Sequence, residues 1–195
     1  MKNIFLFAEA LATKVGWRLI KVDNLWTQVI PQKYISSYSI EGWIWNPRKN
    51  HAGGSIIWKA VVKSVHVLEL NLAWDVGNGR KLRNGEDPWM GSVQQHILPG
   101  PLIENLRDRE IFFLSQLVEP NQDRAWTQAL RQANSLGLED LEEMELAWYI
   151  RELHRAHIHL KHRDDELIRD IDPMGAYTPK DGYIKLSTRV FQRGE

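Results

Sequence analysis

The sequence contains no cysteine among its 195 residues, which excludes disulfide bonds and thiolate-bound zinc. It carries no excess charge of either sign, because 25 basic side chains balance 25 acidic ones. No hydrophobic run approaches the ~18 residues that a membrane-spanning helix requires. The apolar run near Met1 is interrupted by Glu9 and is too short for a secretory signal. We therefore expect an intracellular protein that does not cross a membrane.

The remaining composition is that of a soluble globular protein, with 43% hydrophobic and 26% charged residues. A chain of 195 residues corresponds to one large domain or two small ones. Nine tryptophans are the unusual feature. Most of them fall among other apolar residues at helical or strand spacing, including Trp26, Trp58, Trp126 and Trp148. This spacing predicts core packing for these four side chains.

The charges are unevenly distributed along the chain. Residues 1–100 hold 12 basic and 7 acidic side chains, whereas residues 101–195 hold 13 basic and 18 acidic ones. Prolines 99 and 101 coincide with this change. We therefore expect a basic N-terminal half at 1–98 and an acidic helical half at 99–195, with a single domain as the alternative. The basic half could contact nucleic acid, or it could contact the acidic half.

Helix signals dominate the chain. Residues that commonly cap helices precede apolar stripes at four places, namely Asn3, Asp23 or Asn24, Ser55 and Thr178. Further helices are expected at 111–118, 123–133 and 138–153. Pro31 is expected to stop or kink its helix. Residues 36–54 are polar and predict a loop with at most one short strand.

A single hairpin signal interrupts the helical pattern. The runs 72–76 and 81–83 flank the sequence Gly77-Asn-Gly, and Asn-Gly supplies the positive φ values of a tight turn. The sequence therefore predicts a mainly α fold with one small antiparallel β-hairpin, loosely α+β. The glycine segment is not a phosphate-binding loop, because neither a Gly-Lys-Ser/Thr sequence nor a helix follows it.

Two clusters of chemically active residues point to structural roles. The histidines at 154, 157, 159 and 162 provide i and i+3 pairs on a helix, but the two pairs lie on different faces, which favours a solvated helix end over a metal site. Asp164 and Asp165 resemble the adjacent aspartates of polymerases, but the pattern around them predicts helix or loop instead of a hairpin. We expect no metal site, no cofactor and no catalytic residue.

The hairpin is the candidate nucleic-acid contact. Basic side chains at its turn could bind phosphates, with a tryptophan on which a base could stack. The predicted site residues are Arg80, Lys81, Arg83 and Trp89. Arg48 and Lys49 could join them from the preceding loop. The alternative is a solvated edge strand whose charges prevent aggregation.

Four segments together resemble the polyprotein of plant LINE-type (non-LTR) retrotransposons. Residues 72–83 (LAWDVGNGRKLR) and 87–91 (DPWMG) are similar to its W-x-[IV]-G-N-G and D-x-W patterns. Residues 165–167 (DEL) and 175–183 (GAYTPKDGY) are similar to its D-x-L-x-W and G-x-[YF]-[ST]-x-K-x-x-Y patterns, although Arg169 replaces the last tryptophan of the first. Further likeness lies at 7–20, 25–26, 33–34 and 57–60, so that the resemblance covers nearly the whole chain.

The resemblance implies a connector between the reverse-transcriptase palm and the zinc-binding and RNase H regions. No catalytic carboxylate is carried over, and positions 77–79, Asp87 and Trp89 transfer as structural signatures only. RNA or DNA and the remaining reverse-transcriptase domains are the implied partners, and the nucleus is the implied location if the chain acts with its parent element. The alternative is a helical structural or protein-interaction module without a nucleic-acid role.

Overall fold

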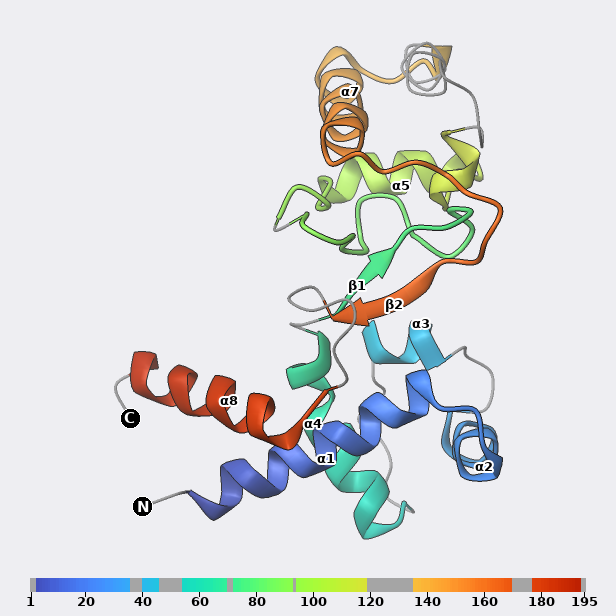
Figure 1. Cartoon of the computed structure of the whole chain (residues 1–195). Helices are drawn as coiled ribbons and strands as arrows, with labels where there is room; N and C mark the ends of the chain where they lie inside the picture. Colours follow the sequence, from blue (N-terminus) through green and yellow to red (C-terminus); the bar gives the residue numbers. More distant parts are fainter. Residues whose placement is uncertain are drawn as a thin grey trace. The chain divides into compact units, whose positions relative to one another are not determined.

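The computed structural model describes residues 3–35, 40–45, 54–69, 72–92, 94–118, 135–169 and 177–193. These residues form seven α-helices, one 3-10 helix and a two-stranded antiparallel sheet (Figure 1). In chain order the elements are α1 (Ile4–Lys21), α2 (Leu25–Tyr34), α3 (Ile40–Trp45), α4 (Ile56–Glu69), β1 (Leu72–Asp75), α5 (Gly100–Asp108), η1 (Leu114–Gln116), α7 (Asp140–Arg155), β2 (Glu166–Arg169) and α8 (Pro179–Arg193). The mainly α fold with one small antiparallel sheet is confirmed.

The chain forms two compact units. Unit 1 consists of Met1–Leu72 and Ile171–Glu195, and unit 2 consists of Ala73–Asp170. The sequence of unit 1 is thus interrupted by that of unit 2. The division expected between residues 98 and 99 falls inside unit 2, directly before α5. The change in charge along the sequence therefore does not coincide with a boundary between compact units.

Four helices of unit 1, namely α1, α2, α4 and α8, begin at the predicted caps. Asn3, Asn24, Ser55 and Thr178 each accept a backbone N–H from the first turn of the helix that follows. Of the two candidates before α2, Asn24 is the cap. A side-chain acceptor at this position satisfies one of the orphan amides at a helix start and stabilises the helix by about 1 kcal/mol.

Unit 1 is a small helical assembly in which α1 packs against both α4 and α8 (Figure 1). Gly16 allows α1 to approach α4 closely, since an added Cβ would lie 2.9 Å from Leu68 Cδ1. Trp58 lies at the centre of the core, stacked 4.8 Å from Tyr34 and 5.0 Å from Trp43 between ring centroids. The predicted burial of Trp58 is therefore confirmed.

Two features of unit 1 differ from the local expectation. Pro31, which was expected to stop or kink its helix, does not stop α2: the helix continues to Tyr34, and the carbonyl of Pro31 accepts the N–H of Ile35. Helix α3 lies within the segment that was predicted to be a loop. Its Trp43 is buried against Trp58, so tertiary packing overrides the polar composition of the surrounding sequence.

In unit 2 the partner of β1 differs from the prediction. Strand β1 pairs with β2, roughly 90 residues later, and not with residues 81–83 across a tight turn (Figure 1). Arg83 instead forms an isolated antiparallel bridge with Phe113, and Trp74 forms a parallel bridge with Trp89. The segment 76–83 is therefore a loop that leaves the sheet and does not form the second arm of a hairpin.

Unit 2 has its own apolar core, to which α5, η1 and α7 contribute. Its fully buried side chains include Leu82, Trp89, Leu102, Leu106, Leu114, Leu117, Leu146, Tyr149, Ile150 and Leu153. The helix expected at 138–153 is present as α7. Residues 111–118 contain only the short η1, and the helix expected at 123–133 lies outside the described residues.

Candidate functional site

The Gly77-Asn-Gly loop wraps around the carboxylate of Asp165. Asp165 Oδ1 accepts the backbone N–H groups of Gly77 at 2.7 Å and Gly79 at 2.9 Å, and Oδ2 accepts that of Lys81 at 2.7 Å. Three amides that converge on one buried anion form an arrangement that commonly binds anions in proteins. Here the anion is supplied by the chain itself. The loop therefore follows the carboxylate and does not turn back along β1.

The local geometry of this loop explains why both Gly77 and Gly79 are glycines. A Cβ on Gly77 would lie 2.2 Å from the carbonyl oxygen of Arg163, which is far inside van der Waals contact. Gly79 has φ +70°, a left-handed conformation that other residues rarely adopt. A backbone hydrogen bond also joins this loop directly to the segment that precedes Asp165, because Lys161 donates its N–H to the carbonyl of Gly77 at 2.7 Å.

Asp164 and Asp165 thus have different environments. Asp165 is buried, and both of its oxygens are engaged by backbone amides. Asp164 is exposed and accepts a hydrogen bond from the side chain of Asn78 at 3.0 Å. The pair holds two segments of unit 2 together, which is a structural role.

Arg83 is engaged by acidic neighbours. Its guanidinium donates to Asp87 Oδ1 at 2.6 Å and to Glu86 Oε2 at 3.2 Å, while its backbone N–H donates to Asp87 Oδ2. Burial alone would lower the pKa of Arg83, but the hydrogen bonds and charges of Asp87 and Glu86 outweigh it, and the net shift is upward. Because two acids hold Arg83 and only 34% of its side chain is exposed, it is a weak candidate for binding phosphate.

Trp89 is a core residue with only 1% of its surface exposed. Its ring lies 5.5 Å from that of Tyr149 in an edge-to-face arrangement. The residues on either side of Trp89 form hydrogen bonds with β1. Trp74 of this strand donates its N–H to the carbonyl of Pro88, and the carbonyl of Trp74 accepts the N–H of Met90. The predicted base-stacking role for Trp89 is therefore wrong, because the ring has no face open to a ligand.

Arg80 and Lys81 are the exposed members of the predicted site. They lie on the loop around Asp165, and the hydrogen bond from Lys161 to Gly77 brings the backbone of a third exposed cation to the same loop. Sequence reasoning missed Lys161, because it lies 80 residues from Lys81 and their proximity depends on Asp165. Arg48 and Lys49 lie outside the described residues.

The histidine cluster is not a continuous helix. Helix α7 ends at Arg155, and His157 adopts a left-handed φ of 55°, which turns the chain into an extended segment. Along that segment Ile158 and Leu160 are buried while His159 and Lys161 are exposed. Among the residues that the structure describes, no group of three or more His, Cys, Asp or Glu side chains could hold a metal ion.

Two of the tryptophans predicted to pack in the core are partly exposed instead. Trp148 on α7 is 44% exposed and Trp26 on α2 is 39% exposed. Trp126 lies outside the described residues. Sequence periodicity placed Trp148 in an apolar stripe, and the stripe exists, but it faces away from the core of unit 2.

No helix among the described residues is long and apolar enough to cross a membrane. Comparison with known proteins found no matching family, no matching curated protein and no matching solved structure.

Proposed function

We propose that this chain is a non-catalytic connector segment of a non-LTR retrotransposon reverse transcriptase, with weak, sequence-independent contact to nucleic acid. The family resemblance motivates the proposal. One observation supports it most strongly: motif segments that are far apart in sequence interlock within unit 2. The carboxylate of Asp165, from the D-x-L segment, binds the amides of the Gly-Asn-Gly segment 86 and 88 residues away.

The D-x-W segment belongs to the same assembly. Asp87 fixes Arg83 at the end of the loop, and Trp89 fills the core beside Tyr149. Mutual contact of this kind is what a signature with a structural role requires, since each group of the signature then holds another. Asp165 has its oxygens occupied by amides, so the proposal assigns no catalysis to it.

Nucleic-acid contact in this proposal rests on Arg80 and Lys81, with Lys161 beside them. All three side chains are exposed. Two or three phosphate contacts give weak binding without sequence preference, with a log–log salt slope of roughly −1.4 to −2.1 on single strands. Arg83 and Trp89 are left out of the contact because the structure pairs one and buries the other.

Binding to a fluorescein-labelled single-stranded RNA, followed by anisotropy between ~50 and ~200 mM salt, tests the contact. We expect the variant R80A/K81A to bind more weakly on every sequence and to flatten the slope by about 1.4. The matched control is K59A/K63A, which removes two exposed cations from α4. The connector origin is tested separately by the flanking genomic reading frames, which should encode palm motifs upstream and Cys/His motifs downstream.

The alternative is a structural or protein-interaction module. The observation that favours it is the apolar exposure of unit 1, where Ile4, Phe5 and Phe7 on α1 are all exposed. Large exposed apolar side chains that gather on one helix often mark a protein contact. The absence of any RNA binding at ~50 mM salt would support this alternative.

A further inference from the structure

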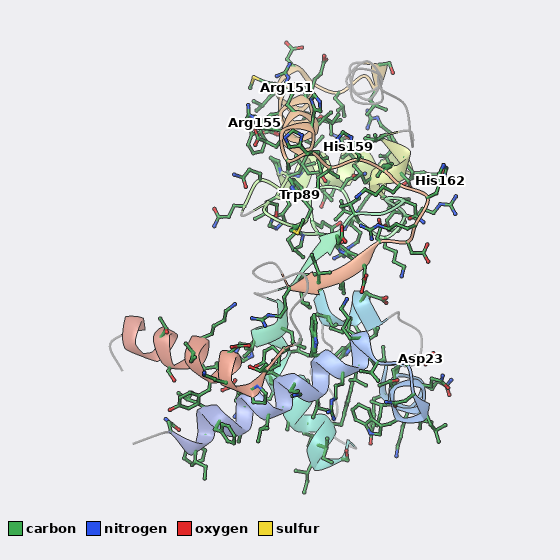
Figure 2. The ribbon with its side chains drawn as sticks, viewed as in Figure 1. Asp23, Trp89, Arg151, Arg155, His159 and His162 are labelled. Carbon is green, nitrogen blue, oxygen red and sulfur yellow. The ribbon has the colours of Figure 1, made fainter. Side chains whose placement is uncertain are left out.

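Helix α7 carries an exposed stripe opposite its buried face. Leu146, Tyr149 and Leu153 are buried in unit 2. The exposed side chains recur at intervals of three and four residues, at Leu141, Met144, Trp148, Arg151 and Arg155. Residues with this spacing lie on one side of a helix. Figure 2 shows Arg151 and Arg155 on the same side of α7.

The stripe changes character along the helix. Its beginning is apolar and lies near the acidic first turn, which contains Asp140, Glu142 and Glu143. Its end is aromatic and cationic, because Arg151 and Arg155 follow Trp148 by one and two turns. Beyond the helix the extended segment adds exposed His159 and Lys161. On this stripe, positive charge and a partly exposed aromatic side chain therefore occur together toward the end of α7.

An acidic side chain near this end of the stripe, that of Glu152, already has a cationic partner. Glu152 forms an ion pair with Arg155, and its side chain is only 12% exposed compared with 75% for Arg155. Arg155 therefore covers the carboxylate and keeps its own guanidinium in solvent. Arg151 is exposed and forms no ion pair among the described residues.

We propose that Trp148, Arg151 and Arg155 form a binding surface for single-stranded nucleic acid, with an unpaired base on the indole and phosphates on the two guanidinium groups. This inference rests on the proposed function and gives it a second site and a ligand class. A sequence-tolerant single-strand site combines an aromatic platform with cations that follow the backbone. A duplex fits less well, because its bases are stacked on one another and offer no free face.

Arg151 and Arg155 favour a polyanion over an apolar protein segment at this end of α7, whereas the acidic side chains Asp140, Glu142, Glu143 and Glu145 all precede Trp148. The two arginines lie four residues apart, roughly 6 Å along the helix axis, on the same side as the indole. An apolar partner would have to desolvate both guanidinium groups without replacing their hydrogen bonds, which is costly. A phosphate chain supplies acceptors for both of them.

The experiment uses the full chain, a fluorescein-labelled single-stranded RNA of 12 nucleotides and the duplex of the same sequence. We expect W148A to weaken single-strand binding by about 5- to 150-fold, the effect of losing one base–aromatic stack. W148F, which keeps an aromatic face, should retain most of the affinity. The matched control is W26A, which removes the partly exposed tryptophan of α2 in unit 1.

The arginines are tested by the salt dependence of binding. R151A/R155A should weaken binding and reduce the log–log salt slope by about 1.4, whereas K59A/K63A, an equally spaced exposed pair on α4, should leave the slope unchanged. Far-UV circular dichroism of each variant should match the unmodified chain, because all the substituted side chains are at least partly exposed.

The outcomes separate this inference from the proposed function. If the chain binds RNA and R80A/K81A weakens it, but W148A and R151A/R155A behave like their controls, the α7 surface is overturned and the proposed function stands. Equal affinity for the duplex overturns the stacking role of Trp148. If no RNA binds at ~50 mM salt, both nucleic-acid proposals fail together.

Discussion

The carboxylate of Asp165 accepts the backbone N–H of Gly77 at 2.7 Å, across a separation of 88 residues. The same carboxylate accepts two further amides, so a single buried side chain fixes the path of the whole loop from 77 to 81. The loop carries Arg80 and Lys81, and the position of the proposed nucleic-acid contact therefore depends on Asp165.

Replacing Asp165 with Asn should destabilise the chain. The amide keeps one oxygen, but its NH2 group meets a backbone N–H that then has no acceptor, and the expected loss is about 1.5–3 kcal/mol in the free energy of unfolding. Urea denaturation measures this loss. The neighbouring change Asp164→Asn is the control, since Asp164 is exposed and makes one side-chain bond, and it should cost about 0.5 kcal/mol or less. Equal losses for the two variants would contradict the assignment.

Gly77→Ala should be poorly tolerated for steric reasons. The new methyl group would lie 2.2 Å from the Arg163 carbonyl oxygen, and either the loop or the facing segment must move. We expect a cost of about 1–3 kcal/mol or more in thermal or urea denaturation. Gly100→Ala at the start of α5 is the matched control, because a Cβ there meets nothing within 4 Å. That variant should be as stable as the unmodified chain.

The pair Arg83 and Asp87 should show energetic coupling in a double-mutant cycle. Asp87 is buried, and it receives both the side chain and the backbone N–H of Arg83. Single Ala substitutions and the double variant should give a coupling of about 1–3 kcal/mol in urea denaturation. The pair Arg155 and Glu152 on α7, whose arginine side chain is 75% exposed, should couple by only about 0.3–0.5 kcal/mol. A coupling near zero for Arg83 and Asp87 would show that the contact adds no stability.

Tyr149 should make stability depend on alkaline pH. Burial raises the pKa of its phenol above the usual value near 10, with a smaller contribution from the charge of Asp87. A group whose folded pKa is raised contributes its full stability below the unfolded pKa, and that contribution is lost as the pH rises above about 10. The free energy of unfolding should therefore fall more steeply between pH 9 and 11 in the unmodified chain than in Tyr149→Phe. Parallel pH profiles would contradict this role.

The local features of the fold were predictable from the sequence. A helix cap needs only one polar side chain next to an apolar stripe. For this reason the caps predicted at Asn3, Ser55 and Thr178 are all confirmed. The core position of Trp58 follows from helical spacing in the same way. These signals lie within a few residues of the structure that they specify.

The features that failed depend on distant partners. Asn-Gly favours a tight turn, but three backbone N–H groups donate hydrogen bonds to the carboxylate of Asp165. These hydrogen bonds outweigh the preference for a tight turn and redirect the loop. Trp89 and Trp148 are both tryptophans near apolar residues, and only the assembled unit 2 shows that one is buried beside Tyr149 while the other faces solvent. Of the candidate site residues, Arg80 and Lys81 are therefore exposed, whereas Trp89 is buried and has no face on which a base could stack.

The pairing of β1 with β2 also has a consequence for how the chain folds. The two strands are separated by roughly 90 residues, and bringing such distant segments together costs about 4 kcal/mol of loop-closure entropy before their contacts form. We therefore expect the sheet to form after the local helices α5 and α7. During synthesis β1 cannot pair with β2 until β2 has left the ribosome, and pairing between such distant segments is expected to slow the assembly of unit 2.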